Sequence, residues 1–120
     1  MGVASSHMDL VPESKVYGDG HCVAFVKEYA GLGPTSGWKR GKKVRGNEVA
    51  RGTPIATFDA AGAYTNVSGS SHAAIFWSQT SEGIVVYDQW KGQPCHQRTL
   101  KFGATGTVNN GDNFYIVDKK

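Results

Sequence analysis

The sequence predicts an α+β domain in which an N-terminal helix packs on a small antiparallel sheet. Two observations predict this class. Apolar residues recur at helical spacing between positions 22 and 30, and short strand-like runs separated by turn residues follow from position 54 onward. Glycine is abundant, with 16 residues in a chain of 120, which indicates many tight turns.

The N-terminus is expected to lie outside the fold. Residues 1–8 resemble an expression-vector remnant, so we assign the single domain to residues 9–120. We find no signal peptide and no apolar run near the roughly 20 residues that a membrane span needs. The sequence therefore predicts a monomer that is made in the cytoplasm and has no membrane partner.

The predicted helix begins near Gly20, with Asp19 as a plausible N-cap. Its apolar stripe, at i, i+3, i+4, i+7 and i+8, consists of Cys22, Phe25, Val26, Tyr29 and Ala30. Glycines and a proline within residues 31–34 end the helix. Cys22 is therefore expected in the first turn, on the face that is directed at the core.

The rest of the chain is expected to be loop and strand. Residues 34–53 have the composition of an irregular loop, and residues 60–71 that of a loop of small residues. The expected strands are residues 54–58, 73–78, 84–90, 96–102 and 114–117, with a turn at 79–83.

Charge is mildly positive, at +3, and gathers between Lys39 and Arg45. Glycines interrupt this stretch, which favours a solvated loop. Affinity for a polyanionic surface is an alternative, and nucleic-acid binding is another, although we expect no nucleic-acid partner.

Cys22 is a candidate nucleophile. A thiolate requires a lowered pKa, and the free N–H groups and dipole of a helix N-terminus supply part of that. The backbone N–H of Cys22 would also be available as an oxyanion donor. The helix alone leaves open the alternative of a buried structural cysteine, because that is a common fate of cysteine on an apolar stripe.

His72 and Asp88 are the candidates for a base and its orienting acid. If the hairpin turn centres on Thr80, Phe76 lies opposite Ile84 and His72 lies opposite Asp88 on the same face. A carboxylate beside the imidazole would orient the ring and leave its other nitrogen for a thiol. A surface His–Asp pair at a strand end is the alternative, and a slip of one residue would separate the two.

Three short motifs carry a family resemblance. GHCVAFVKEY resembles the nucleophile motif of the CHAP domains (cysteine, histidine-dependent amidohydrolases/peptidases), SHAAIFW their histidine strand, and VVYDQW their third motif. GWKRGKKVRGN and RGTPIATF are similar to the loop and first strand between the first two motifs. The match covers most of residues 17–92, and its order of Cys, His and acid is that of the papain-like, NlpC-like superfamily.

The resemblance implies a papain-like fold and hydrolysis of amide bonds in peptidoglycan, in the peptide stem or at the muramoyl–alanine bond. It assigns Cys22 as nucleophile, His72 as base and Asp88 as orienting acid, although Asp replaces the usual Glu. His21, Gln89 and Trp90 are the candidates for an oxyanion site or for lining the substrate site.

A short chain with these motifs and no recognisable wall-binding module resembles the amidase effectors that type VI secretion systems inject. The resemblance implies action in the periplasm or on the wall of a target cell after secretion. A cognate immunity protein is the partner that it suggests.

Cys95 and His96 stand beside each other, as do His21 and Cys22. A structural zinc site made by these four residues is chemically possible, but adjacent residues rarely ligate one ion together. We therefore expect no metal and no cofactor. Cys95 is expected to be an inert buried thiol, with an oxidative bridge to Cys22 as an alternative. The rival to the enzyme is a catalytically inactive binding or inhibitor protein of the same fold.

Overall fold

The computed structural model describes residues 21–59, 61–64, 71–90 and 92–119. Within them the elements are α1 (Cys22–Ala30), η1 (Thr35–Gly37), β1 (Trp38–Lys43), β2 (Pro54–Thr57), β3 (Ala73–Gln79), β4 (Gly83–Trp90), β5 (Gln93–Lys101), η2 (Thr107–Asn109), η3 (Gly111–Asn113) and β6 (Phe114–Lys119). The expected remnant at residues 1–8 and most of the expected 60–71 loop lie outside the described residues.

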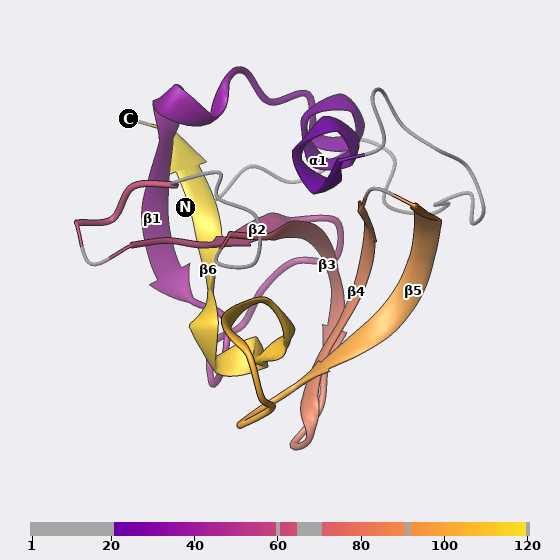
Figure 1. Ribbon diagram of the computed structural model, residues 1–120. Coiled ribbons are helices and arrows are strands. Elements are labelled where there is room, and N and C mark those ends of the chain that lie inside the picture. Colours follow the sequence, from indigo (N-terminus) through magenta and orange to yellow (C-terminus); the bar gives the residue numbers. More distant parts are fainter. Residues whose placement is uncertain (1–20, 60, 65–70, 91, 120) are drawn as a thin grey trace.

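The strands form one six-stranded sheet in the order β1-β6-β2-β3-β4-β5, in which every neighbouring pair is antiparallel. Figure 1 shows α1 lying against the sheet near one end of β3 and β4. The predicted class, one helix on an antiparallel sheet, is confirmed. In the described part of the chain no helix is both long and apolar enough to cross a membrane.

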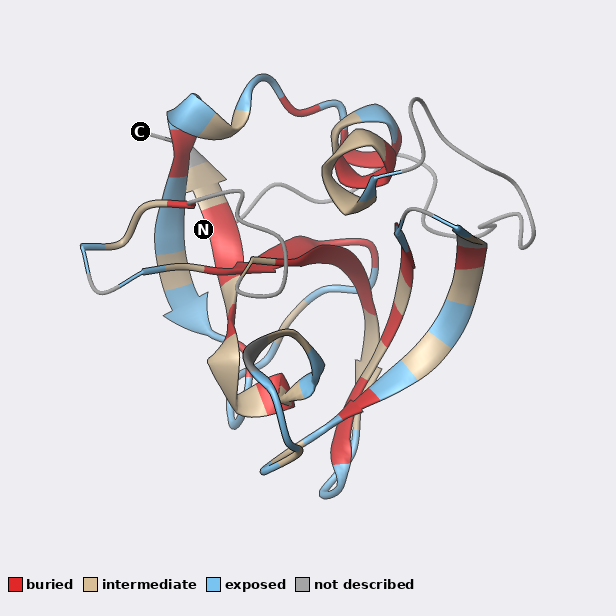
Figure 2. Ribbon diagram, in the orientation of Figure 1, coloured by how far each residue is buried: buried red, intermediate tan, exposed pale blue. Residues whose placement is uncertain are grey.

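The sheet has buried apolar side chains in two separate clusters, and Figure 2 shows in red where the buried residues lie along the chain. The helix-side core, between α1 and the sheet, consists of Phe25, Val26, Tyr29, Ala30, Leu32, Trp38, Ala56, Tyr64, Ala73, Ile75, Cys95 and Val117. The far-side core consists of Val44, Ile55, Ala74, Phe76, Ile84, Val86, Leu100, Phe114 and Ile116. Because successive side chains of β3 point to opposite faces of the sheet, Ala73 belongs to the helix-side core and Ala74 to the far-side core.

Helix α1 buries the predicted stripe, and its last four stripe residues, Phe25, Val26, Tyr29 and Ala30, are its buried residues. Its end is also as predicted, because Gly31 has φ 69° and its backbone N–H donates to the Lys27 carbonyl oxygen. The predicted N-cap was wrong. The cap position is occupied by His21, whose side chain makes no capping hydrogen bond.

The expectation of an irregular loop over residues 34–53 was wrong for Trp38–Lys43, which forms edge strand β1. Trp38 pairs with Lys119 and Arg40 with Val117 of β6. Trp38 is buried, whereas all four Lys and Arg residues of the strand are exposed. Lysine-rich edge strands are a common protection against edge-to-edge pairing, so the charge that suggests a loop is compatible with an edge.

The β3–β4 hairpin forms where predicted, but its register differs by two residues. Phe76 pairs with Val86 rather than with Ile84. Nearer the turn, where Gln79 pairs with Ile84, the difference is three residues, and the irregularity between Phe76 and Ser78 reduces it to two. A shift of two preserves the face of every side chain. His72 and Asp88 therefore remain on one face, as diagonal rather than directly opposed neighbours.

Candidate active site

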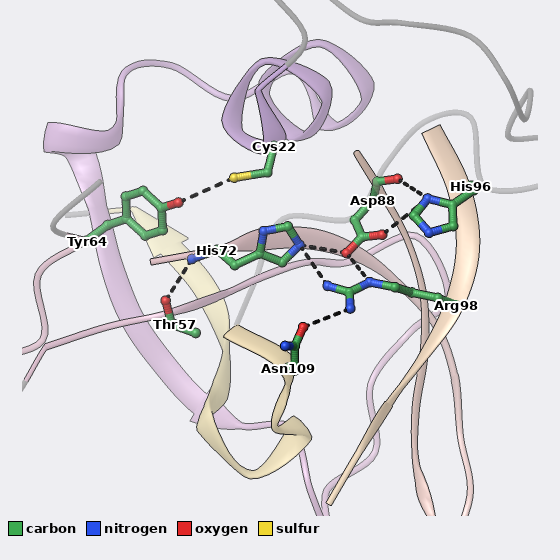
Figure 3. Close-up of polar contacts among 8 residues, drawn as sticks. All are labelled: Cys22, Thr57, Tyr64, His72, Asp88, His96, Arg98 and Asn109. Atoms are coloured by element: carbon green, nitrogen blue, oxygen red, sulfur yellow. Dashed lines mark hydrogen bonds and ion pairs between the residues drawn. The ribbon is translucent and has the colours of Figure 1, made fainter. Parts of the chain in front are cut away.

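Cys22 is the first residue of α1, and its partly buried side chain packs against the helix-side core. The sulfur lies 3.8 Å from the hydroxyl oxygen of Tyr64. In Figure 3 it also lies above the His72 ring, so two side chains approach the sulfur from different directions. The thiol is thus placed at a helix N-terminus, beside polar groups.

His72 precedes β3 and is buried. Its backbone N–H donates to Thr57 Oγ1 (3.0 Å), and its carbonyl oxygen accepts from the Thr57 N–H (3.0 Å). Its Nε2 lies 2.6 Å from Asp88 Oδ2. The other ring nitrogen points toward the sulfur of Cys22 (Figure 3). The contact predicted between His72 and Asp88 is therefore confirmed.

Asp88 is fully buried, and its Oδ2 has a second partner. Arg98 Nε donates to this oxygen at 2.8 Å, while Nη2 of Arg98 lies 3.4 Å from His72 Nε2. Arg98 Nη1 also donates to Asn109 Oδ1 at 3.1 Å. A guanidinium only donates and a carboxylate only accepts, so Asp88 accepts from Arg98 and, through the same oxygen, from His72. The carboxylate thus favours the His72 tautomer that carries its proton on Nε2.

An aromatic and a second histidine border this network on its outer side. His96 Nδ1 lies 3.2 Å from the Asp88 carbonyl oxygen and 3.8 Å from Asp88 Oδ1. Trp90 is 39% exposed, and its ring centroid lies 6.4 Å from that of His72 and 5.1 Å from that of His96. The Arg98 guanidinium lies 4.9 Å from the Trp90 ring centroid. Trp90 is therefore at the rim of the site, where it was expected to line the substrate cleft.

The electrostatics favour a charge-separated Cys22–His72 pair. Burial opposes the thiolate, but hydrogen bonds and charge from His72, with smaller contributions from Ala73 and Tyr64, leave the pKa of Cys22 below its ordinary value. Burial likewise opposes the imidazolium, but Asp88 and Cys22 outweigh it and raise the pKa of His72 to about 9. Each group stabilises the charged form of the other, as nucleophilic cysteine requires.

Gln89 and His21 lie on the helix side of the sheet. Gln89 is fully buried, and its Nε2 donates to the His21 carbonyl oxygen at 2.8 Å. This bond ties β4 to the residue before Cys22. Two adjacent residues of β4 therefore contact different parts of the site: Asp88 contacts the His72 imidazole, and Gln89 contacts the backbone just before α1. His21 itself is exposed.

Cys95 is fully buried in the helix-side core, and neither it nor Cys22 is in a disulfide. Cys95 is thus buried, as expected, and its inertness stays a prediction. Among the described residues, no group of three or more His, Cys, Asp and Glu side chains is placed to hold a metal ion.

Two residues of the site were not found from the sequence. Tyr64 lies in a loop of small residues that has no periodicity, so nothing local indicates a partner. Arg98 could have been found from strand pairing. His96 lies opposite Asp88, and Arg98, two residues on in β5, is then a diagonal neighbour of the carboxylate on the same face.

A cysteine at the start of a helix, packed on an antiparallel sheet that presents a buried His–Asp pair, defines the papain-like cysteine hydrolases of NlpC-like type. A comparison with known families gives a closer assignment. The chain belongs to the domesticated amidase effector 2 family, whose model matches residues 4–117.

Relatives and a solved structure agree with this assignment. The chain is 45% identical over 103 residues to "Domesticated amidase effector 2" of Ixodes scapularis, covering 81% of this chain and 70% of that protein. It is 40% identical over 119 residues to "Type VI secretion amidase effector 2 protein" of Salmonella typhi, covering 87% and 89%. A structure of "Type 6 secretion amidase effector 2 (Tae2)" superposes with a TM-score of 0.87 at 28% identity, covering 98% of this chain and 94% of that one. The expected resemblance to type VI amidase effectors is confirmed.

Proposed function

We propose that the protein is a cysteine amidase that hydrolyses amide bonds of bacterial peptidoglycan, with Cys22 as nucleophile, His72 as base and Asp88 as the residue that orients His72. One observation carries the proposal. The imidazole is hydrogen-bonded to a buried carboxylate through Nε2, while its other nitrogen points toward a thiol at a helix N-terminus. The names of the relatives, all of them amidase effectors, supply the reaction class.

In the acylation step, the Cys22 thiolate attacks the carbonyl carbon of the scissile amide. A C–S bond forms, and the π electron pair of the carbonyl moves onto its oxygen. When the C=O bond re-forms, the C–N bond breaks and the amine leaves with the proton of the His72 imidazolium. The product is a thioester on Cys22.

Hydrolysis of the thioester restores the enzyme. His72, now neutral, takes a proton from water, and the resulting hydroxide equivalent adds to the thioester carbonyl. Collapse of the second tetrahedral intermediate breaks the C–S bond and releases a carboxylic acid. The thiolate and the imidazolium then re-form. Asp88 keeps the same ring nitrogen directed at the reacting atoms throughout, because it accepts from the other one.

The substrate class that fits is the amide of a peptide stem or the muramoyl–alanine bond. Both present an amide carbonyl to the sulfur, and both release an amine that needs the proton of His72. The exposed Trp90 borders the histidine and offers an apolar surface for the chain on either side of the bond.

Substitution of Cys22 by alanine tests the assignment. We expect Cys22→Ala to remain folded and to release no new amine or carboxylate ends from purified peptidoglycan. The matched control is Cys95→Ala, which removes the other, buried thiol and should retain hydrolysis. Mass spectrometry of the released fragments would identify the bond. Hydrolysis by Cys22→Ala equal to that of the unchanged protein would contradict the role of Cys22.

The alternative of an inactive binding protein predicts an unreactive thiol. Iodoacetamide should label Cys22 rapidly near neutral pH if the thiolate–imidazolium pair forms, and His72→Ala should slow that labelling. Binding of peptidoglycan without release of fragments, together with a slow thiol, would favour the alternative.

We further propose that the protein acts outside the cell that makes it, on the wall of a target cell, as the names of its relatives suggest. A producer that has a peptidoglycan wall would then need protection. The proposed partner is a cognate immunity protein that covers the site near Cys22 and Trp90. Co-purification with the neighbouring gene product, lost when Trp90 is replaced by Glu, would support it; absence of binding and of protection would contradict it.

A further inference from the structure

We propose that the hydroxyl of Tyr64 is an oxyanion donor, and so a catalytic residue, in the attack of Cys22 on its amide substrate. This inference rests on the proposed function and extends it to a residue outside the Cys–His–Asp set. The observation behind it is the position of the Tyr64 hydroxyl oxygen, which lies 3.8 Å from the Cys22 sulfur. Tyr64 is buried, with 8% of its surface exposed.

The Tyr64 ring is held by packing. Its centroid lies 5.1 Å from that of Trp38, which is buried at the start of β1, and 6.3 Å from that of Phe58. These contacts place the ring in the helix-side core and leave its polar end directed at the sulfur (Figure 3). A tyrosine fixed in this way presents its hydroxyl with little conformational freedom to lose.

Hydrogen bonds also join Asp59 to residues just before Tyr64. Asp59 Oδ1 accepts from the N–H groups of Ala61 (3.0 Å) and Ala63 (2.8 Å), and the Asp59 N–H donates to the Ala63 carbonyl oxygen (2.9 Å). Arg40 of β1 donates to the Asp59 carbonyl oxygen at 3.3 Å. These Asx-type hydrogen bonds from Asp59 reach Ala63, one residue before the tyrosine.

The hydroxyl is a donor at any pH at which the enzyme works. Burial, and then the charge of the Cys22 thiolate, raise the pKa of Tyr64 well above its ordinary value. The phenol therefore keeps its proton beside the thiolate. In the resting site it donates toward the sulfur, and it is not consumed as an acid, because His72 supplies the proton for the leaving amine.

The direction of the hydroxyl suits the charge that develops. When the thiolate attacks, the C–S bond forms and the negative charge moves from sulfur to the carbonyl oxygen. That oxygen is bonded to the carbon that sulfur attacks, so it forms in the space around the sulfur that Tyr64 borders. His72 approaches the sulfur from another direction (Figure 3), so the donor and the base do not compete for one place. The Cys22 backbone N–H, at the free start of α1, is a second donor.

Two rival roles give different results. Tyr64 could act only as packing, or it could act only by stabilising the thiolate. Tyr64→Phe keeps the packed ring and removes the hydroxyl, so it separates packing from donation. Alkylation by iodoacetamide uses the same thiolate but forms no oxyanion, so it separates thiolate stabilisation from oxyanion stabilisation.

The experiment compares the unchanged protein, Tyr64→Phe, Cys22→Ala and Tyr87→Phe on soluble cross-linked fragments of peptidoglycan. Tyr87→Phe is the matched control, because it removes a hydroxyl that meets Gln97 on the same sheet. We expect Tyr64→Phe to lower kcat about 100-fold with KM nearly unchanged, which is the usual loss for one oxyanion donor. We expect its alkylation rate at Cys22 to stay within about threefold of the unchanged protein, because Tyr64 is the smallest contributor to the lowered pKa of Cys22. Tyr87→Phe should keep full kcat.

Full kcat in Tyr64→Phe would overturn the proposal while leaving Cys22 as the nucleophile. Parallel losses of kcat and alkylation rate would also overturn it and assign Tyr64 to thiolate stabilisation. If the unchanged protein released nothing, or if Cys22→Ala were fully active, the proposed function itself would fail. Thermal melting and near-UV circular dichroism of each variant would establish that the comparison is made between folded proteins.

Discussion

Two arginine–aspartate pairs in this protein have similar geometry and very different surroundings. Arg45 and Asp112 meet at 2.6 Å with side chains that are 49% and 25% exposed. Arg98 and Asp88 meet at 2.8 Å with side chains that are 21% and 0% exposed. Each arginine also lies over an aromatic ring, at 4.3 Å from Phe102 and 4.9 Å from Trp90.

The difference between the pairs lies in what each carboxylate would lose. Water can replace Arg45 at the exposed Asp112, and salt screens the pair. At the fully buried Asp88, a lost partner leaves a charge in a medium of low polarity. Asp88 also holds the imidazole of His72 through the same oxygen that Arg98 contacts. The contribution of each pair to stability therefore depends on the burial of the carboxylate and, for Asp88, on its contact with His72, and not on the Arg–Asp distance.

The largest expected effect is that of Asp88→Asn on catalysis. We expect kcat to fall about 10³–10⁴-fold, because the amide can no longer favour the tautomer in which the nitrogen facing Cys22 is free. The pH profile should move as well. In the unchanged protein the activity should decline as the pH rises through about 9, where His72 loses its proton. Without Asp88 that pKa is lower, so the alkaline limb should shift to lower pH.

Kinetics of peptide release as a function of pH, on the unchanged protein and Asp88→Asn, would measure both effects. Asp112→Asn is the control, since this aspartate accepts from the exposed Arg45 and from the Gly103 N–H. An alkaline limb that stays near pH 9 in Asp88→Asn would show that Asp88 does not set the charge of His72.

The next effect is on stability. Arg98→Met removes the guanidinium and keeps much of the side-chain volume over Trp90. We expect the free energy of unfolding to fall by about 3 kcal/mol, because the fully buried Asp88 loses one of its two charged partners and keeps only His72. The double variant Arg98→Met/Asp88→Asn should lose less than the sum of the single variants, because each single variant already removes the contact between the two side chains. Urea denaturation of the four proteins measures the coupling, and strict additivity would contradict it.

Loss of the uncharged hydrogen bond between Gln89 and the His21 carbonyl oxygen should lower the stability less than loss of Arg98 does. Gln89→Met removes the hydrogen bond to the His21 carbonyl oxygen and preserves volume in the fully buried site. We expect a loss of about 1–2 kcal/mol in unfolding free energy. Activity should fall with little change in the pH profile, because the bond positions the start of α1 and leaves His72 untouched. A shifted profile would instead indicate that Gln89 acts on the ionisable pair.

The smallest effect is expected for Arg45→Met. The pair with Asp112 is exposed, so the melting temperature should stay within experimental error and kcat should not change. Differential scanning calorimetry at low and high salt would measure it. A loss as large as that of Arg98→Met would mean that burial is not what distinguishes the two pairs.

The strongest sequence predictions depended on periodic patterns. The stripe of α1, its end at Gly31 and the β3–β4 hairpin all follow from local spacing and turn residues. Strand β1 was missed because local composition resembled a loop, whereas its pairing with β6 joins distant parts of the chain. The register was also wrong, since neither the pairing of Gln79 with Ile84 next to the turn nor the irregularity after Phe76 leaves a clear trace in the pattern.

By itself, the sequence determined the apolar stripe of the helix that carries Cys22 and the face on which His72 and Asp88 lie together. Those features depend on the periods of helix and strand, which a two-residue shift in register does not alter. Tertiary structure decided how α1 brings its sulfur to the imidazole of His72, which precedes β3. It also decided that Tyr64 joins the site, because contacts between segments far apart in the chain are set by packing, which no local pattern records.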